Sequence, residues 1–130
     1  MSQENVRLVR ESFERWNRGD RDFSRAEVLH SDFQVISRIP SEPFRGVEGL
    51  RRWMREIDDQ FEEWQVVVEE LRDAGDHVVV LGQLRLRGKG SGVALEQSAG
   101  WLFEFQEDKL YRLQMFARPD EALEAGGLSE

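Results

Sequence analysis

The sequence contains no cysteine, only two histidines, one tyrosine and three prolines among its 130 residues. The lack of cysteine excludes disulfide bonds and thiolate chemistry, and two histidines far apart in the sequence do not form a metal-binding signature. No apolar run approaches the roughly 18 residues of a membrane span, and the first residues lack the apolar segment of a signal peptide. We therefore expect a cytoplasmic protein that holds neither a metal ion nor an organic cofactor.

The sequence also has fewer positive than negative charges: it contains 18 lysines and arginines and 26 aspartates and glutamates, so its net charge is −8. A phosphate backbone or an anionic membrane surface would be repelled on average, so neither nucleic acid nor membrane is an expected partner. Hydrophobic residues make up 39% of the chain and aromatic residues 10%, which is too apolar for a disordered chain. The length suits a single domain over residues 1–130 with one core.

Apolar residues recur at helical spacing in the first half of the chain. The first predicted helix ends at Gly19 and is based on Val6, Val9, Phe13 and Trp16. A shorter helix is expected over residues 23–30. Gly46 precedes a third helix, whose apolar face contains Leu50, Trp53, Met54, Ile57 and Phe61.

The apolar period changes from three or four residues to two after Trp64, which predicts strands. One earlier strand is expected at residues 33–39, before a loop with two prolines. The later strands are expected at residues 65–71, 77–87, 93–106 and 109–118, with a glycine-rich hairpin tip at 88–92 and a tight turn at Glu107-Asp108. Helices followed by a run of long strands predict an α+β fold whose sheet curls around the helices and can leave a cavity.

Several segments together resemble SnoaL-like proteins of the nuclear transport factor 2-like superfamily. In chain order these are LHSDF, FRGVEGLRRW, DAGDHVVVLGQLRLRG, FEFQEDKLYRLQMF and DEALEAGGL. The resemblance implies a conical α+β barrel, with three N-terminal helices packed in a strongly curved, mainly antiparallel sheet around an apolar pocket. It also implies a homodimer that forms through the sheet. The family includes polyketide cyclases, ketosteroid isomerases, dehydratases, epoxide hydrolases and non-catalytic binding proteins, so the function must be argued from the site.

The isomerase relatives use a tyrosine and two aspartates, and the surroundings of these groups tune their pKa values for catalysis. The corresponding positions here, by motif order, fall near Ser12, Ser37 and Trp101. None of these residues is a carboxylic acid or a phenol. The isomerase mechanism is therefore not expected.

A cyclase or dehydratase would need another acid–base residue that faces the pocket, and His30 and Asp32 are the candidates. In that reading Tyr111 or Arg85 would stabilise an enolate-like oxygen. The alternative is that His30 and Asp32 only cap a helix and form a surface turn. Arg85 alternates with Leu84 and Leu86, and the alternation does not say which set faces inward.

Aromatic and apolar residues on the predicted helices and strands are candidates for the pocket wall, together with a few polar residues. The predicted ligand-binding residues are Phe13, Trp16, Phe33, Ser37, Trp53, Ile57, Arg85, Trp101, Phe103, Tyr111 and Met115. Three functions remain open: binding of a hydrophobic or aromatic small molecule, cofactor-free acid–base catalysis, and a dimeric interaction protein with a filled pocket. A cavity that contains a carboxylate or imidazole would favour the second, and the absence of a cavity the third.

Overall fold

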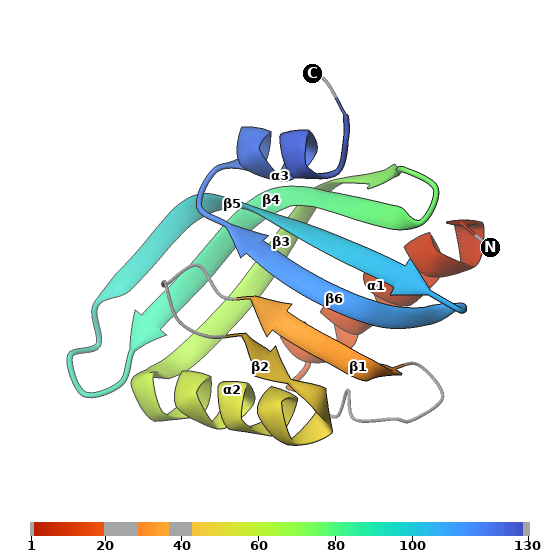
Figure 1. Cartoon of the computed structure of the whole chain (residues 1–130). Helices are drawn as coiled ribbons and strands as arrows, with labels where there is room; N and C mark the ends of the chain where they lie inside the picture. Colours follow the sequence, from red (N-terminus) through yellow and green to blue (C-terminus); the bar gives the residue numbers. More distant parts are fainter. Residues whose placement is uncertain (1, 20–28, 37–42, 129–130) are drawn as a thin grey trace.

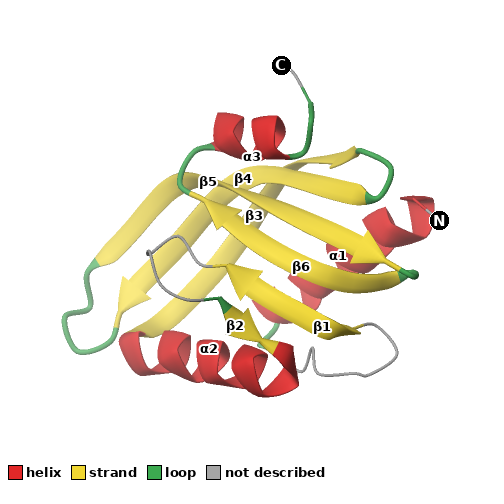
Figure 2. Cartoon of the chain, in the orientation of Figure 1, coloured by secondary structure: helices red, strands yellow, loops and turns green. Residues whose placement is uncertain are grey.

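The computed structural model describes residues 2–19, 29–36 and 43–128 of the chain (Figure 1). These residues form an α+β fold, and Figure 2 distinguishes its helices from its strands. In chain order the elements are α1 (Ser2–Asn17), β1 (Leu29–Ile36), β2 (Phe44–Arg45), α2 (Gly46–Gln60), β3 (Phe61–Asp73), β4 (His77–Gly88), β5 (Ala94–Gln106), β6 (Lys109–Phe116) and α3 (Pro119–Ala125).

The strands form one six-stranded sheet in the order β2-β1-β6-β5-β4-β3, with β2 and β3 at its two edges. The sheet is mixed, because β1 pairs with β6 in parallel while the other neighbours are antiparallel. It is open rather than closed into a barrel. The α+β class is confirmed, and the conical form predicted from the resemblance is not.

Alternation along the strands separates an inner face from an outer face of the sheet. On β5, Trp101 and Phe103 belong to the inner face and to the main core, which also contains residues of α1 and α2. Leu102 belongs to the outer face, where it packs with Val79 of β4 and with Leu123 of α3. The alternation predicted for β5 is thus correct.

Two predicted turns have the backbone geometry that their residues favour. Glu107 and Asp108 both have positive φ angles, 55° and 61°. A two-residue hairpin turn of type I′ requires this conformation at both positions, and aspartate tolerates it better than most residues. Gly19 has a φ of 89° and ends α1, as expected.

The three helices predicted ahead of the strands are not confirmed. The described residues hold two helices before β3, and α3 follows the last strand. Residues 23–28 of the predicted second helix lie outside the described residues, as do residues 37–39 of the predicted early strand. Leu29 and His30 are not helical but begin β1, because Leu29 pairs with Leu110 of β6.

The boundary between α2 and β3 also lies elsewhere than predicted. Phe61 fits the apolar spacing of α2, but it takes an extended conformation and pairs with Gly88 of β4. The hydrogen-bonded ladder with β4 therefore determines where the helix ends, although the side-chain spacing would allow one more turn. No described helix is long and apolar enough to cross a membrane.

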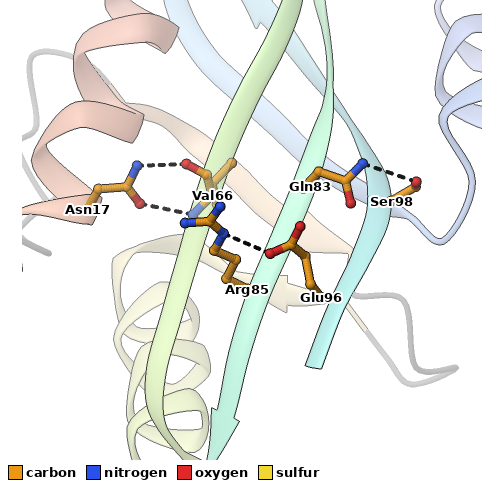
Figure 3. A network of polar contacts seen from close by, with 6 residues as sticks. All are labelled: Asn17, Val66, Gln83, Arg85, Glu96 and Ser98. Carbon is orange, nitrogen blue, oxygen red and sulfur yellow. Dashed lines mark hydrogen bonds and ion pairs between the residues drawn. The ribbon is translucent and has the colours of Figure 1, made fainter. Parts of the chain in front are cut away.

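The C-terminal end of α1 is hydrogen-bonded to the free edge of β3, as Figure 3 shows for Asn17. The side-chain amide of Asn17 donates to the carbonyl oxygen of Val66 at 2.7 Å and accepts from its N–H at 3.0 Å. The indole N–H of Trp16 donates to the carbonyl oxygen of Trp64 at 2.8 Å. Side chains of α1 thereby satisfy backbone groups of an edge strand. This fixes the apolar face of α1 against the inner face of the sheet.

Candidate functional site

A cavity of about 80 Å³ lies between α1, α2 and the inner face of the sheet. Its wall is formed by Leu8, Val9, Ser12, Phe13, Trp16, Leu29, Phe33, Leu50, Trp53, Trp64, Val66, Trp101, Phe103, Phe105, Leu110, Leu113 and Met115. All four tryptophans of the chain belong to this wall. The tryptophans are therefore intrinsic probes of this site.

Two contacts between aromatic rings of the wall are edge to face, and a third is tilted. The ring of Phe13 lies 5.5 Å from the ring of Trp101, at an interplanar angle of 66°, and 5.5 Å from the ring of Phe103, at 83°. Trp16 of α1 and Trp53 of α2 lie 5.9 Å apart with their rings tilted by 31°. Edge-to-face contacts of this kind add to the stability that burial provides. Phe13 thus joins the helix layer to the sheet across the cavity.

The wall contains very few polar side chains. Among the described lining residues, Ser12 carries the only side-chain oxygen, and its hydroxyl donates to the carbonyl oxygen of Leu8 at 2.8 Å. None of the described lining residues has an acidic or basic side chain. The described part of the chain also contains no group of three or more His, Asp or Glu residues that could hold a metal ion. No described side chain in this wall could therefore act as a general acid or base at neutral pH, or pair with a cation as a carboxylate does.

The size of the cavity limits what fits in it. An apolar cavity of about 150 Å³ engineered into another protein binds benzene. The cavity of about 80 Å³ described above is roughly half as large, so a single ring requires small movements of the wall. Met115 is suited to such movement because its thioether chain is flexible and polarisable. A polycyclic molecule would require a rearrangement of the helices.

His30 and Asp32 lie outside this cavity. The Nδ1 atom of His30 accepts a hydrogen bond from the backbone N–H of Asp32 at 3.0 Å, and its Nε2 atom lies 3.7 Å from Oε1 of Glu107. Its ring lies edge to face with that of Tyr111, at 5.3 Å. Asp32 is exposed, in a polar depression of about 390 Å³ that Arg45 and Tyr111 also line. The structure thus brings both residues together within β1, away from the apolar wall.

Two other predicted ligand-binding residues are turned away from the cavity. A register shift in the β5–β6 ladder places Leu110 opposite Phe105 and Arg112 opposite Glu104, so that Tyr111 is the extra residue. Leu110 takes the inward place that simple alternation gives to Tyr111. Arg85 lies on the outer face, where its guanidinium pairs with Glu96 of β5 at 2.9 Å (Figure 3). The inward neighbours of Arg85 on β4 are Leu84 and Leu86.

The remaining predicted residues fall into three groups. Ile57 is buried in the core without being part of the cavity wall. Ser37 lies outside the described residues. The wall contains Phe13, Trp16, Phe33, Trp53, Trp101, Phe103 and Met115.

Ten lining residues were not among the predicted ligand-binding residues: Leu8, Val9, Ser12, Leu29, Leu50, Trp64, Val66, Phe105, Leu110 and Leu113. Helical spacing could have revealed the α1 residues, since Leu8 and Ser12 precede Trp16 by eight and four positions. Trp64 was placed at the end of the helix region, although it lies within β3. The inward position of Leu110 depends on a β-bulge that the sequence pattern does not indicate.

Comparison with known proteins assigns the chain to the family that its sequence resembles. The sequence profile of the SnoaL-like domain family matches residues 9–113 of the chain. A comparison with curated proteins gave no match.

Three solved structures illustrate the similarity. A nuclear transport factor 2-like protein of unknown function from Burkholderia pseudomallei K96243 has a TM-score of 0.77 and 17% identity, over 95% of this chain and 96% of the other. A candidate SnoaL-like polyketide cyclase from Jannaschia sp. CCS1 has a TM-score of 0.72 and 26% identity, over 88% and 85%. A protein with a ketosteroid isomerase-like fold from Catenulispora acidiphila DSM 44928, in complex with trimethylamine, has a TM-score of 0.71 and 18% identity, over 94% and 93%.

Proposed function

This chain belongs to the SnoaL-like domain family, and on that premise we propose that it binds a small, uncharged, apolar or aromatic molecule in its cavity without transforming it. The observation that supports this is the composition of the wall, in which Ser12 is the only described residue with a side-chain oxygen. A charged ligand would find no oppositely charged group among the described residues of the wall, and the free-energy cost of burying an unpaired charge is large. An uncharged ligand loses far less and gains apolar contact on every side.

The volume of the cavity narrows the ligand to a short chain or a single ring. The similar protein from Catenulispora acidiphila is in complex with trimethylamine, which supports a ligand of small size but not the absence of charge, because this amine is protonated at neutral pH. The candidate polyketide cyclase from Jannaschia sp. CCS1 suggests that an aromatic or ketide-like ring is a reasonable chemical class. A single ring of that type is the largest ligand that the described wall accommodates with small movements.

Acid–base catalysis has less support than binding. Cyclisation, isomerisation and dehydration each need a base within hydrogen-bonding reach of the substrate. His30 and Asp32, the candidates for that role, contact each other and the β5–β6 turn instead. A dimeric protein with a filled pocket also has less support, because a cavity of about 80 Å³ is present.

Toluene is a suitable first ligand, and the indole N–H signals of the four tryptophans in a ¹H–¹⁵N spectrum are the measurement. We expect toluene to shift these signals in a saturable way. Leu113→Phe should weaken binding by at least roughly tenfold, because the larger side chain fills space in the wall. Gln114→Phe places the same ring on the opposite face of β6 and should leave binding unchanged.

Unchanged indole signals at saturating toluene would contradict the proposed function. Equal loss of binding in the Leu113 and Gln114 variants would show that the effect comes from β6 as a whole rather than from the cavity.

We also propose that two copies of the chain pair through the outer face of β4 and β5. The support is a ladder of cross-strand pairs on that face, in which Arg85 contacts Glu96 at 2.9 Å and Gln83 donates to the hydroxyl of Ser98 at 3.3 Å (Figure 3). A surface that carries both signs of charge side by side is self-complementary under a two-fold axis. A dimer of this type would leave the cavity on the inner face accessible.

Glu96→Arg is expected to shift the dimer to a monomer, because contacts between Arg85 of one copy and residue 96 of the other would then bring like charges together. Sedimentation velocity measures the change, and Arg51→Glu on exposed α2 is the matched charge-reversal control. A sedimentation coefficient that is the same for the wild type and Glu96→Arg would contradict pairing through this face.

A further inference from the structure

We infer that Ser12 selects ligands that carry one hydrogen-bond donor, such as a phenol, over ligands of the same size that only accept hydrogen bonds. This inference rests on the proposed binding function and names the ligand class more narrowly. It makes Ser12 a specificity-determining residue of the cavity. The argument depends on where the single hydroxyl proton of Ser12 is used.

A serine hydroxyl has one proton to donate and two lone pairs that accept. In α1 the hydroxyl of Ser12 donates that proton to the carbonyl oxygen of Leu8, one helical turn earlier, at 2.8 Å. Back-bonding of this kind is the usual arrangement for serine within a helix. The proton of Ser12 is therefore already used, and its lone pairs remain available.

Ser12 is only half-buried and lies in the cavity wall, next to deeply buried neighbours such as Val9. A phenol or an alcohol in the cavity can donate to Ser12 while the bond from Ser12 to Leu8 persists. Two hydrogen bonds then exist where one existed before. A nitrile or carbonyl ligand gains a bond from Ser12 only if the hydroxyl turns and leaves Leu8, so the total number of bonds does not rise.

A second polar group in the wall, the indole N–H of Trp16, also has a hydrogen-bond partner already. The indole N–H of Trp16 donates to the carbonyl oxygen of Trp64 at 2.8 Å. The remaining described residues of the wall carry only hydrocarbon, thioether or indole side chains. A donor on the ligand therefore finds its side-chain oxygen partner at Ser12, the only described lining residue that carries one.

Three single-ring ligands test the inference: toluene without a hydrogen-bonding group, phenol with a donor, and benzonitrile with an acceptor only. For each ligand we compare the dissociation constant of Ser12→Ala with that of the wild type, from the tryptophan indole signals. The ratio cancels the hydration of the ligand itself, because the same molecule leaves water in both titrations. Alanine is a better helix former than serine, so the variant is expected to fold.

Phenol should bind Ser12→Ala about five- to tenfold more weakly than the wild type, the usual range for one hydrogen bond. Toluene and benzonitrile should bind both proteins about equally. Ser91→Ala, which removes an exposed hydroxyl in the β4–β5 hairpin, should change none of the three ratios.

An unchanged phenol ratio, with toluene still bound, would overturn the inference and leave the proposed function standing. Equal losses for benzonitrile and phenol would also overturn it, because the hydroxyl would then turn and donate. If toluene does not bind the wild type at all, the proposed function fails and the inference fails with it.

Discussion

Gly82→Ala is expected to lower the free energy of unfolding by about 3 kcal/mol or more, a loss at the high end for single substitutions. A Cβ atom at Gly82 would overlap the carbonyl oxygen of Val67, and it would lie 3.1 Å from the carbonyl carbon of Val67 and 3.3 Å from the backbone nitrogen of Glu69. All three atoms belong to the backbone of β3, which has no rotamer to change.

The position of Gly82 in the β3–β4 ladder explains why there is no space for a Cβ atom. The β3–β4 ladder shifts its register between Val68 and Glu70, and Gly82 pairs with Val68 at that shift. Bulges bring the two backbones into an irregular approach, and glycine is the residue that tolerates it. Relief of the overlap would require the bulge to move, which would displace neighbouring inner-face residues of β3.

Gly88→Ala is the matched control, because it makes the same substitution on the same strand. The closest atom to a Cβ at Gly88 is the hydroxyl oxygen of Ser91, at 2.6 Å, and that side chain can rotate away. We expect a cost below about 1 kcal/mol in urea unfolding, as for ordinary surface substitutions. Equal midpoints for the two variants would show that the sheet adapts at Gly82 and that the close approach is not required.

The sequence predicted the strands of the second half of the fold well, for a physical reason. The period of two is clearest where only one face is buried, as in β4, where buried Leu84 and Leu86 alternate with exposed Arg85 and Arg87. The Glu107-Asp108 turn was also correct because two residues between strands permit few conformations. The early helices were predicted less well. The segment ending at His30 is short, and pairing with β6 rather than local spacing decides that Leu29 is extended.

Seven of the eleven predicted ligand-binding residues lie in the cavity wall, and the register of the strands explains why Tyr111 does not. Alternation places side chains correctly only while the ladder is regular. The register shift at Glu104 and Phe105 reverses the direction of Tyr111, which alternation assigns to the inner face. For Arg85 the sequence left both faces open, and the inward burial of Leu84 and Leu86 decides the question. Tertiary register, which is a property of paired strands, is absent from the local sequence pattern.

Phe13→Ala is expected to reduce the free energy of unfolding by about 3–5 kcal/mol, as is usual when a buried phenylalanine is truncated. Phe13 is 9% exposed and contacts both Trp101 and Phe103 edge to face. The loss includes the apolar burial of the ring, the two aromatic contacts and the void that remains. Phe13→Leu retains most of the volume and should cost less than about 1.5 kcal/mol. Urea unfolding, followed by circular dichroism, measures both values.

The same substitution should change which ligands bind. Naphthalene exceeds the cavity of about 80 Å³, so the wild type and Phe13→Leu should not bind it, whereas Phe13→Ala should bind it in the space that the phenyl ring vacates. Bound naphthalene should then raise the unfolding midpoint of Phe13→Ala and of no other variant, since a ligand stabilises only the state that binds it. Naphthalene binding to the wild type would show that the wall yields far more than its packing indicates, and the limit to a single ring would be wrong. A Phe13→Ala protein that remains empty would show that its wall collapses into the vacated space, in which case its loss of stability should fall near the lower end of the expected range.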